Sequence, residues 1–132
     1  MKKFGYIIIT TLIVIGVVWL IVTPGKVKVG IYDNFAKCIK DKGVKFFGAF
    51  WCPHCAAQKT RFGTATKYLP YIECSNPDGQ TQTQICKDNQ IMTYPTWDFP
   101  PGLIANSTTT VRKTGEQELT DLAQATSCVL PQ

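Results

Sequence analysis

The hydrophobic residues are distributed so unevenly that they divide the chain into two parts. No charged residue occurs from Phe4 to Val22, and this run of about 19 residues would form a helix about 28 Å long, enough to cross the core of a bilayer. Pro24 and Gly25 end the run, and a mixed pattern of apolar and polar positions follows. We therefore predict a membrane anchor and the start of a tether over residues 1–25, and a globular domain over residues 26–132.

A cleaved signal peptide is the main alternative for the first segment. The apolar part of a signal peptide usually has about 7–15 residues and ends at a site of small residues. The run in this chain is longer and ends in Val22-Thr23-Pro24-Gly25, which does not resemble such a site. The pattern favours an anchor that stays attached to the domain.

The first half of the globular domain shows the pattern of a helix, a strand and a second helix. Apolar residues recur with helical spacing after Asp33, which is a typical N-cap, and Gly43 ends this helix. The apolar and aromatic run from Val44 to Trp51 predicts a buried strand. Pro53 suits the first turn of the next helix, because an N–H group at that position would have no partner within the helix.

The second half of the domain alternates short apolar runs with polar segments. It contains a predicted strand over residues 71–74, a loop over 75–79, a helix over 81–89, an aromatic stretch over 96–99 that leads into a hairpin, a strand near 110–113 and an amphipathic helix over 115–127. This order predicts an α/β fold with a mixed central sheet and helices on both faces. Four aromatic residues are expected in the core: Phe46, Phe47, Phe50 and Trp97.

The charge of the chain does not favour a nucleic-acid partner. The net charge is +5, from 14 Lys and Arg against 9 Asp and Glu. The basic residues are scattered, mostly as single lysines, and form no arm or stripe. We therefore expect no binding of nucleic acid.

The cysteine content indicates the compartment of the domain. Six cysteines in 132 residues is a high and even count, which is typical of disulfides. Disulfides persist outside the cytosol and are rare inside it. The lysines that flank the apolar run are nearly balanced in number and leave its orientation open. Because of the cysteines, we expect a single-pass membrane protein with its N-terminus in the cytoplasm and its C-terminal domain on the extracytoplasmic side, periplasmic or extracellular.

The tetrapeptide Cys52-Pro53-His54-Cys55 is the main candidate for chemistry. A structural zinc site normally takes four ligands, commonly from two paired clusters, and only one CxxC is present, so no metal is expected. A purely structural disulfide is also disfavoured, because a bridge across this short spacing would be tight and exposed. A redox pair fits the same spacing better, since an exposed bridge is readily exchanged.

Cys52 and Cys55 are expected to have different roles. The thiolate is the attacking form of cysteine, and Cys52 lies where the free N–H groups and the dipole of a helix stabilise negative charge. His54 adds a donor and a positive charge nearby. Cys55, one turn further along, is placed to resolve a mixed disulfide. We expect Cys52 to be the exposed attacking sulfur and Cys55 the more buried partner, with no metal or organic cofactor required.

These residues give the chain a resemblance to a known superfamily. A CxxC pair that opens a helix after a strand, with an X-Pro about forty residues later, resembles the thioredoxin superfamily, and Cys-Pro-His-Cys resembles the motif of DsbA-type oxidases. The resemblance implies a thioredoxin-like fold and a cis proline that packs beside the CxxC pair and holds an edge for the substrate backbone. Tyr94 and Pro95 occupy that position, with an ordinary turn as the alternative reading. Trp51 is expected to line the active-site surface.

A more specific resemblance covers most of residues 35–128. FGAFWCPHC, LPYIECS, the later Cys86, YPTW and the helix GEQELTDLAQATSC together resemble the thioredoxin-like domain linked to bacterial vitamin K epoxide reductase homologues. In those fusions the membrane module reoxidises the CPHC domain. The resemblance therefore implies a separate, quinone-linked membrane oxidase as partner. It also implies a second disulfide between Cys74 and Cys86, as a structural staple or as an electron relay.

Cys38 and Cys128 remain after these assignments. A third disulfide between them would join the first and last helices of the domain. In a thioredoxin-like layout those helices tend to lie on opposite faces of the sheet, which counts against the pairing, so it stays open.

The direction of the redox reaction is the last inference from the sequence. Thioredoxin-type reductases carry a buried carboxylate in the strand before CxxC, and residues 44–50 contain no acid. We therefore expect an oxidase that donates the Cys52–Cys55 disulfide to cysteine-containing substrate proteins. The alternatives are a reductase or isomerase fed by a membrane electron donor, and a non-catalytic anchored binding module.

Overall fold

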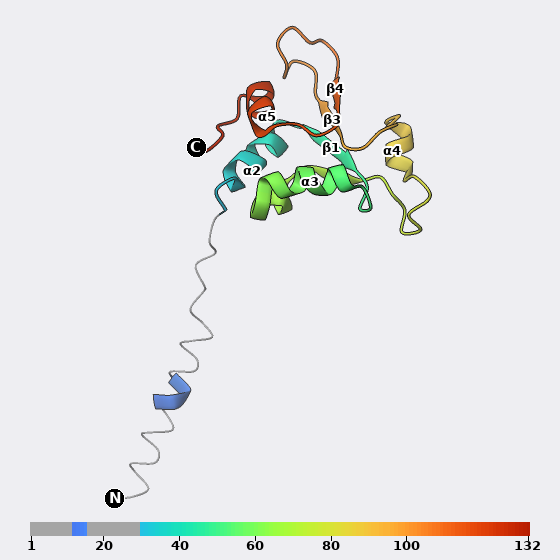
Figure 1. The fold of residues 1–132 in the computed structure, drawn as a ribbon. Helices are drawn as coiled ribbons and strands as arrows, with labels where there is room; N and C mark the ends of the chain where they lie inside the picture. Colours follow the sequence, from blue (N-terminus) through green and yellow to red (C-terminus); the bar gives the residue numbers. More distant parts are fainter. Residues whose placement is uncertain (1–11, 16–29) are drawn as a thin grey trace, which may run out of the picture.

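A mixed sheet of four strands forms the centre of the computed structural model, which describes residues 12–15 and 30–132 (Figure 1). The strands are β1 (Lys45–Gly48), β2 (Tyr71–Glu73), β3 (Thr96–Phe99) and β4 (Val111–Thr114), in the spatial order β2-β1-β3-β4. β1 pairs in parallel with β2 and antiparallel with β3, and β3 pairs antiparallel with β4. The predicted α/β class with a mixed sheet is confirmed, and this arrangement fits a thioredoxin-like fold.

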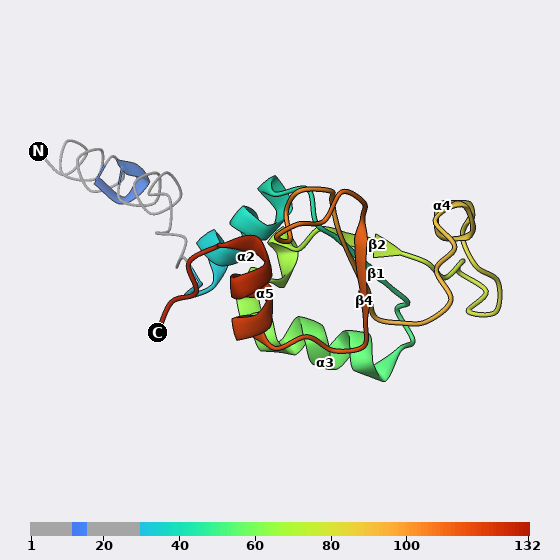
Figure 2. The same ribbon diagram turned by 90° about the horizontal axis from the view of Figure 1, so that it is seen from above.

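Helices cover both faces of this sheet, as the sequence predicts. They are α2 (Asp33–Asp41), α3 (Pro53–Phe62), the 3-10 helix η1 (Gly63–Tyr68) that continues α3, α4 (Gln84–Asp88) and α5 (Leu119–Thr126). Figure 2 shows the strands between α2 and α5 on one side and the short α4 on the other. The coverage is uneven, because α2, α3 and α5 all pack on the same face.

The larger core lies under these three helices. Alternate side chains of a strand point to opposite faces, and Phe46 of β1 and Trp97 of β3, which are register partners, both face this core. Their rings stack with centroids 4.3 Å apart. Phe35 of α2 and Phe62 of α3 stack in the same cluster at 5.9 Å. These aromatic contacts attach α2 and α3 to the sheet.

The smaller core lies on the opposite face, under α4. Phe47, the next residue along β1, packs there with Ile91 and with the disulfide between Cys74 and Cys86. Arg112 of β4 donates to both carboxylate oxygens of Asp98, and also to the carbonyl oxygens at the end of α4. The disulfide and Arg112 together hold a helix of only five residues against the sheet.

One predicted core position and one strand boundary differ from the structure. β1 ends at Gly48, three residues before the predicted end at Trp51. The chain turns there, because the N–H of Cys52 donates to the carbonyl oxygen of Ala49. Phe46, Phe47 and Trp97 are buried as predicted, but Phe50 lies in this turn and is 58 % exposed, so its assignment to the core is wrong.

Three helix boundaries also differ from the predictions. Asp33 is the first residue of α2 and not its cap: the N-cap is Tyr32, and the N–H of Asp33 donates to the carbonyl oxygen of Gly30. α4 begins three residues later than predicted, because Gln82 forms a β-bridge with Ser75. α5 begins after the extended residue Glu118, and Glu116 and Gln117 make contacts with α3 instead.

The predicted anchor over residues 1–25 lies almost wholly outside the described residues. Residues 12–15, inside the apolar run, are helical. Within residues 12–15 and 30–132 no helix has the length and apolarity needed to cross a bilayer. The anchor therefore stays a prediction from the sequence.

Candidate active site

Cys52 and Cys55 lie at the start of α3, directly after the turn that ends β1. Cys52 is the N-cap, with extended backbone angles (φ −79°, ψ 118°), and Pro53 is the first helical residue. The Cys52 sulfur accepts a hydrogen bond from the N–H of Cys55 at 3.3 Å. An N-cap side chain normally accepts from the free N–H groups of the first turn. A sulfur anion at this position would be stabilised by the same amides and by the helix dipole.

Cys52 is less accessible than the sequence predicts, whereas Cys55 is buried as predicted. Cys52 and Cys55 are free cysteines, 5 % and 1 % exposed. The order of exposure follows the expectation, but Cys52 is not openly exposed as expected, because Ala49 and Tyr94 pack against it. A substrate thiol therefore has only a narrow approach to the Cys52 sulfur.

The loop that carries Tyr94 and Pro95 lies directly beside Cys52. The peptide bond between these two residues is cis. The thiol of Cys52 donates to the carbonyl oxygen of Tyr94 at 3.8 Å. Trp51 meets the Tyr94 ring edge-to-face at 5.9 Å, and its indole N–H donates to the Ser75 hydroxyl at 2.9 Å. Trp51 is 53 % exposed and forms part of the surface next to Cys52.

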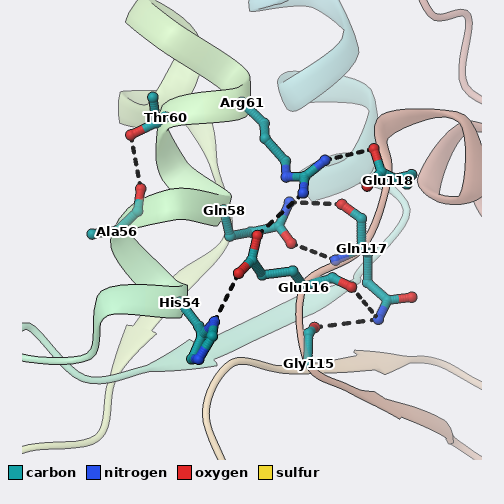
Figure 3. Close-up of polar contacts among 9 residues, drawn as sticks. All are labelled: His54, Ala56, Gln58, Thr60, Arg61, Gly115, Glu116, Gln117 and Glu118. Atoms are coloured by element: carbon teal, nitrogen blue, oxygen red, sulfur yellow. Dashed lines mark hydrogen bonds and ion pairs between the residues drawn. The ribbon is translucent and has the colours of Figure 1, made fainter.

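The sequence predicts that His54 supplies a donor and a positive charge near Cys52, but in the structure its side chain contacts Glu116. Its ring is 69 % exposed, and its Nδ1 lies 2.8 Å from Oε1 of Glu116, in the segment between β4 and α5 (Figure 3). The other oxygen of Glu116 accepts from Arg61, which also pairs with Glu118. The bonds from His54 and Arg61 lower the pKa of the Glu116 carboxyl below its usual value. The Nδ1 atom of His54 is therefore engaged with Glu116.

A buried amide joins the same two segments behind His54. Gln58 of α3 is fully buried; its side chain donates to the carbonyl oxygen of Gln117 at 3.0 Å and accepts from the N–H of Gln117 at 2.6 Å (Figure 3). Both polar ends of the amide are satisfied by one backbone residue, as burial requires. The contact holds α3 in a fixed position relative to the segment before α5.

The Cys55 sulfur is buried close to β1 and Tyr71. Burial, with a smaller contribution from the hydrogen bond to Cys52, raises the pKa of the Cys55 thiol to about 12. Gly48 of β1 lies against the sulfur: a Cβ at Gly48 would be 2.8 Å from the Cys55 sulfur and 2.8 Å from Cε2 of Tyr71. The absence of a side chain at Gly48 allows Cys55 and Tyr71 to lie next to each other.

Tyr71 connects this region to a carboxylate and a cation. Its hydroxyl donates to Oε2 of Glu73 at 2.9 Å, and the ammonium group of Lys59 lies 3.3 Å from the centre of its ring. Oε1 of Glu73 accepts from the N–H groups of Phe50 and Ser75. Glu73 is the register partner of Gly48, so a carboxylate does lie at the end of β1, but it comes from β2.

The four other cysteines form two disulfides in the structure. Cys74–Cys86 links the end of β2 to α4, and Cys38–Cys128 links α2 to the residues after α5, with Cα atoms 5.5 Å and 5.9 Å apart. The expectation that the first and last helices lie on opposite faces is wrong. α2 and α5 share one face and one core, which brings Cys38 and Cys128 within bonding distance.

Sequence reasoning missed several residues of this site. The helical spacing of four between Cys55 and Lys59 could have indicated that they share a face of α3. The contacts of Gln58, Glu73 and Glu116 had no such signal, because each depends on a segment distant in the sequence. Among residues 12–15 and 30–132, no group of three or more His, Cys, Asp and Glu side chains is arranged to hold a metal ion.

Comparison with known proteins agrees with this chemistry. No family model matches the chain. The thiol-disulfide oxidoreductase LTO1 of Arabidopsis thaliana is 42 % identical over 102 residues, which is 74 % of this chain and 24 % of the relative. The chain thus spans about a quarter of the length of the relative that it matches. By its name, this relative is a thiol–disulfide oxidoreductase, and the free pair Cys52 and Cys55 has the thiol chemistry of that class.

Proposed function

We propose that this chain is a membrane-anchored, extracytoplasmic thiol–disulfide oxidoreductase that donates the Cys52–Cys55 disulfide to cysteine-containing substrate proteins. The observation that carries the proposal is the position of the pair: Cys52 caps α3, its sulfur accepts from the N–H of Cys55, and Tyr94 lies beside it. The name of the Arabidopsis relative supports the same class of reaction.

The reaction has two exchange steps. A substrate thiolate attacks the Cys52 sulfur of the disulfide; the bond between Cys52 and Cys55 breaks, a bond between substrate and Cys52 forms, and Cys55 leaves with the electron pair. A second substrate thiolate then attacks the substrate sulfur of this mixed disulfide, and Cys52 leaves as a thiolate. The substrate loses two electrons, and Cys52 and Cys55 end as a dithiol. Cys52 is the better site of attack because it is the more exposed residue of the pair. The stabilisation of its anion at the helix N-terminus makes Cys52 a good leaving group in the second step.

The oxidase direction and the location rest on three further features. The two other disulfides suit an oxidising compartment. The apolar run from Phe4 to Val22 is long enough for an anchor. β1 itself carries no acid, unlike the corresponding strand of thioredoxin-type reductases. We further propose a quinone-linked membrane oxidase of the vitamin K epoxide reductase type as the partner that reoxidises the pair, and a gene for such an oxidase beside this one would support this step.

The exposed apolar residues near the site suit an unfolded substrate. Phe50 and Trp51 precede Cys52, and Met92, which is 88 % exposed, lies in the loop that leads to the cis peptide bond. Exposed apolar side chains beside a reactive group suit the binding of an apolar partner segment. Cysteine-containing chains that have not yet buried their own apolar residues fit this surface.

The proposal is tested with the oxidised full-length chain in mild detergent and a reduced peptide that contains two cysteines. The wild type should form the peptide disulfide, and Cys52→Ser should not. Cys55→Ser is the matched control: it cannot form the donated disulfide and should not oxidise the reduced peptide. When the disulfide form of the peptide is added instead, the Cys52 thiolate of this variant should attack it, one peptide sulfur should leave as a thiolate, and a mixed disulfide with Cys52 should accumulate. Equal peptide oxidation by the wild type and Cys52→Ser would instead favour a non-catalytic binding module.

The direction is tested by the reduction potential of the Cys52–Cys55 pair in glutathione buffers. An oxidase should have a potential well above the value of about −270 mV of thioredoxin. A potential at or below that value would overturn the oxidase assignment and favour a reductase or isomerase fed by a membrane electron donor.

A further inference from the structure

The leaving sulfur of the proposed reaction lies in surroundings that oppose a negative charge. When a substrate thiolate opens the Cys52–Cys55 disulfide, Cys55 receives the electron pair while it is 1 % exposed. Burial is the largest cause of the raised pKa of its thiol. Water cannot solvate this anion well, so a positively charged group of the protein near Cys55 contributes to its stability.

The elements packed around Cys55 offer five titratable or charged groups. They are Cys52 and Lys59 of α3, Tyr71 and Glu73 of β2, and Tyr94 of the loop before β3. β1 contributes Gly48 and, just beyond its end, Ala49, which carry no charge. Lys59 is the positively charged member of this set.

The two tyrosines of this set do not supply a positive charge to the Cys55 anion. Burial, followed by the hydrogen bond to Glu73, raises the pKa of Tyr71, so its hydroxyl stays protonated. The hydroxyl of Tyr94 accepts a hydrogen bond from Gln82 at 2.7 Å, on the side of the loop that also contacts Trp51. Neither tyrosine stabilises a neighbouring anion by charge.

Lys59 is held by the ring of Tyr71, which also lies close to Cys55. Its ammonium group lies 3.3 Å from the centre of the Tyr71 ring, a close cation–π contact. The edge of that ring and the Cys55 sulfur both border the space left by Gly48. The Tyr71 hydroxyl is held by Glu73, whose carboxylate also accepts from two backbone N–H groups. Against the effect of burial, a hydrogen bond with the backbone of Ala49 and, to a smaller extent, the charge of Lys59 lower the pKa of the Cys55 thiol.

We propose that Lys59 is a positioning residue for the resolving cysteine: held over Tyr71, its ammonium group stabilises the sulfur anion that Cys55 carries when the Cys52–Cys55 disulfide opens. The inference rests on the proposed exchange reaction. In the forward step the substrate sulfur bonds to Cys52, the Cys52–Cys55 bond breaks, and the electron pair goes to Cys55 near Lys59. The Cys55 anion then takes the proton that the attacking substrate thiol released to solvent. In the reverse step Cys55 loses that proton before it attacks Cys52.

The first test measures the reactivity of the Cys55 thiol and does not depend on catalysis. In full-length Cys52→Ala, Cys55 is the free thiol that remains among the described cysteines, and its alkylation by iodoacetamide is followed against pH. Adding Lys59→Met should lower the alkylation rate at a fixed alkaline pH about tenfold, which corresponds to about one pH unit in the profile. Lys59→Arg should restore most of the rate. An identical pH profile with Met and with Lys at position 59 would overturn the proposal.

A matched control separates the charge of Lys59 from general effects of removing a lysine. Lys67 lies over the ring of Tyr68 at 5.0 Å, in η1, and does not affect the pKa of Cys55. Lys67→Met should leave the alkylation profile unchanged, and an equal fall in rate for both variants would contradict the assignment. Lys59→Gln replaces Lys59→Met if the methionine variant loses the far-ultraviolet circular dichroism of the wild type.

The second test uses the intact Cys52–Cys55 pair. The oxidised full-length Lys59→Met chain should react with dithiothreitol about tenfold more slowly than the wild type, with Lys67→Met at the wild-type rate. Failure of the wild type itself to react would refute the proposed function. A normal wild-type rate with no difference for Lys59→Met would refute only the role of Lys59.

Discussion

The disulfide between Cys38 and Cys128 should contribute more to the free energy of unfolding than the disulfide between Cys74 and Cys86. It joins residues 90 positions apart, whereas Cys74 and Cys86 are 12 apart. A cross-link restricts the unfolded chain more strongly when it closes a longer loop. The perturbation is the replacement of both cysteines of a pair by alanine, in two separate variants of the full-length chain.

The loop lengths set the expected magnitudes. In the chain-entropy model, a separation of 90 corresponds to about 4.6 kcal/mol and a separation of 12 to about 2.8 kcal/mol at 25 °C. Alanine also removes buried sulfur at both sites. This packing loss is somewhat larger at Cys74 and Cys86, which are fully buried, than at the partly exposed Cys38. We expect the loss of Cys38–Cys128 to remove a large fraction of the stability, since small domains have about 5–15 kcal/mol in total.

Equilibrium unfolding in urea, followed by far-ultraviolet circular dichroism, measures both losses. The wild type with all disulfides intact is the reference, and mass spectrometry of alkylated protein checks that the remaining disulfide is present in each variant. The free energy of unfolding should fall by about 4–5 kcal/mol in Cys38→Ala/Cys128→Ala. A fall below about 2 kcal/mol would refute the reasoning, because the restriction of the long loop would then not be what the bond contributes.

Two further predictions concern residues beside the active site. Gly48→Ala places a Cβ 2.8 Å from both the Cys55 sulfur and Tyr71, and it should lower the free energy of unfolding by about 1–3 kcal/mol in urea; an unchanged midpoint would contradict this packing. Because His54 and Arg61 lower the pKa of Glu116, its ion pairs stabilise the fold above the ordinary carboxyl pKa, and this contribution is lost as the pH falls through the lowered value. Glu116→Gln should therefore have a lower free energy of unfolding than the wild type at neutral pH and the same value in strong acid. A difference that persists in strong acid would show that the ion pairs of Glu116 are not its cause. The control is Glu118→Gln, which leaves the contact between His54 and Glu116 in place.

The order of the elements and the position of the CxxC pair were largely predictable from local patterns. The apolar run before Trp51 indicated β1, and Pro53 indicated the start of α3, because both signals depend on residues that are neighbours in the sequence. The errors at Phe50 and at the start of α4 have a common reason. In both places a contact outside the predicted element ends it early or delays its start. The hydrogen bond from the Cys52 N–H turns the chain after β1, and the bridge between Gln82 and Ser75 keeps residues before α4 extended.

The surroundings of the two sulfurs were decided by tertiary structure. The sequence determined that Cys52 would cap a helix and that Cys55 would follow one turn later. It did not determine that β2 would place Glu73 beside Gly48, or that the segment before α5 would place Glu116 against His54. These contacts depend on strand register and on which face each helix covers, and both are set by the packing of the whole core. The pairing of Cys38 with Cys128 has the same origin, because only the packing of α2 and α5 on one face of the sheet brings these distant cysteines together.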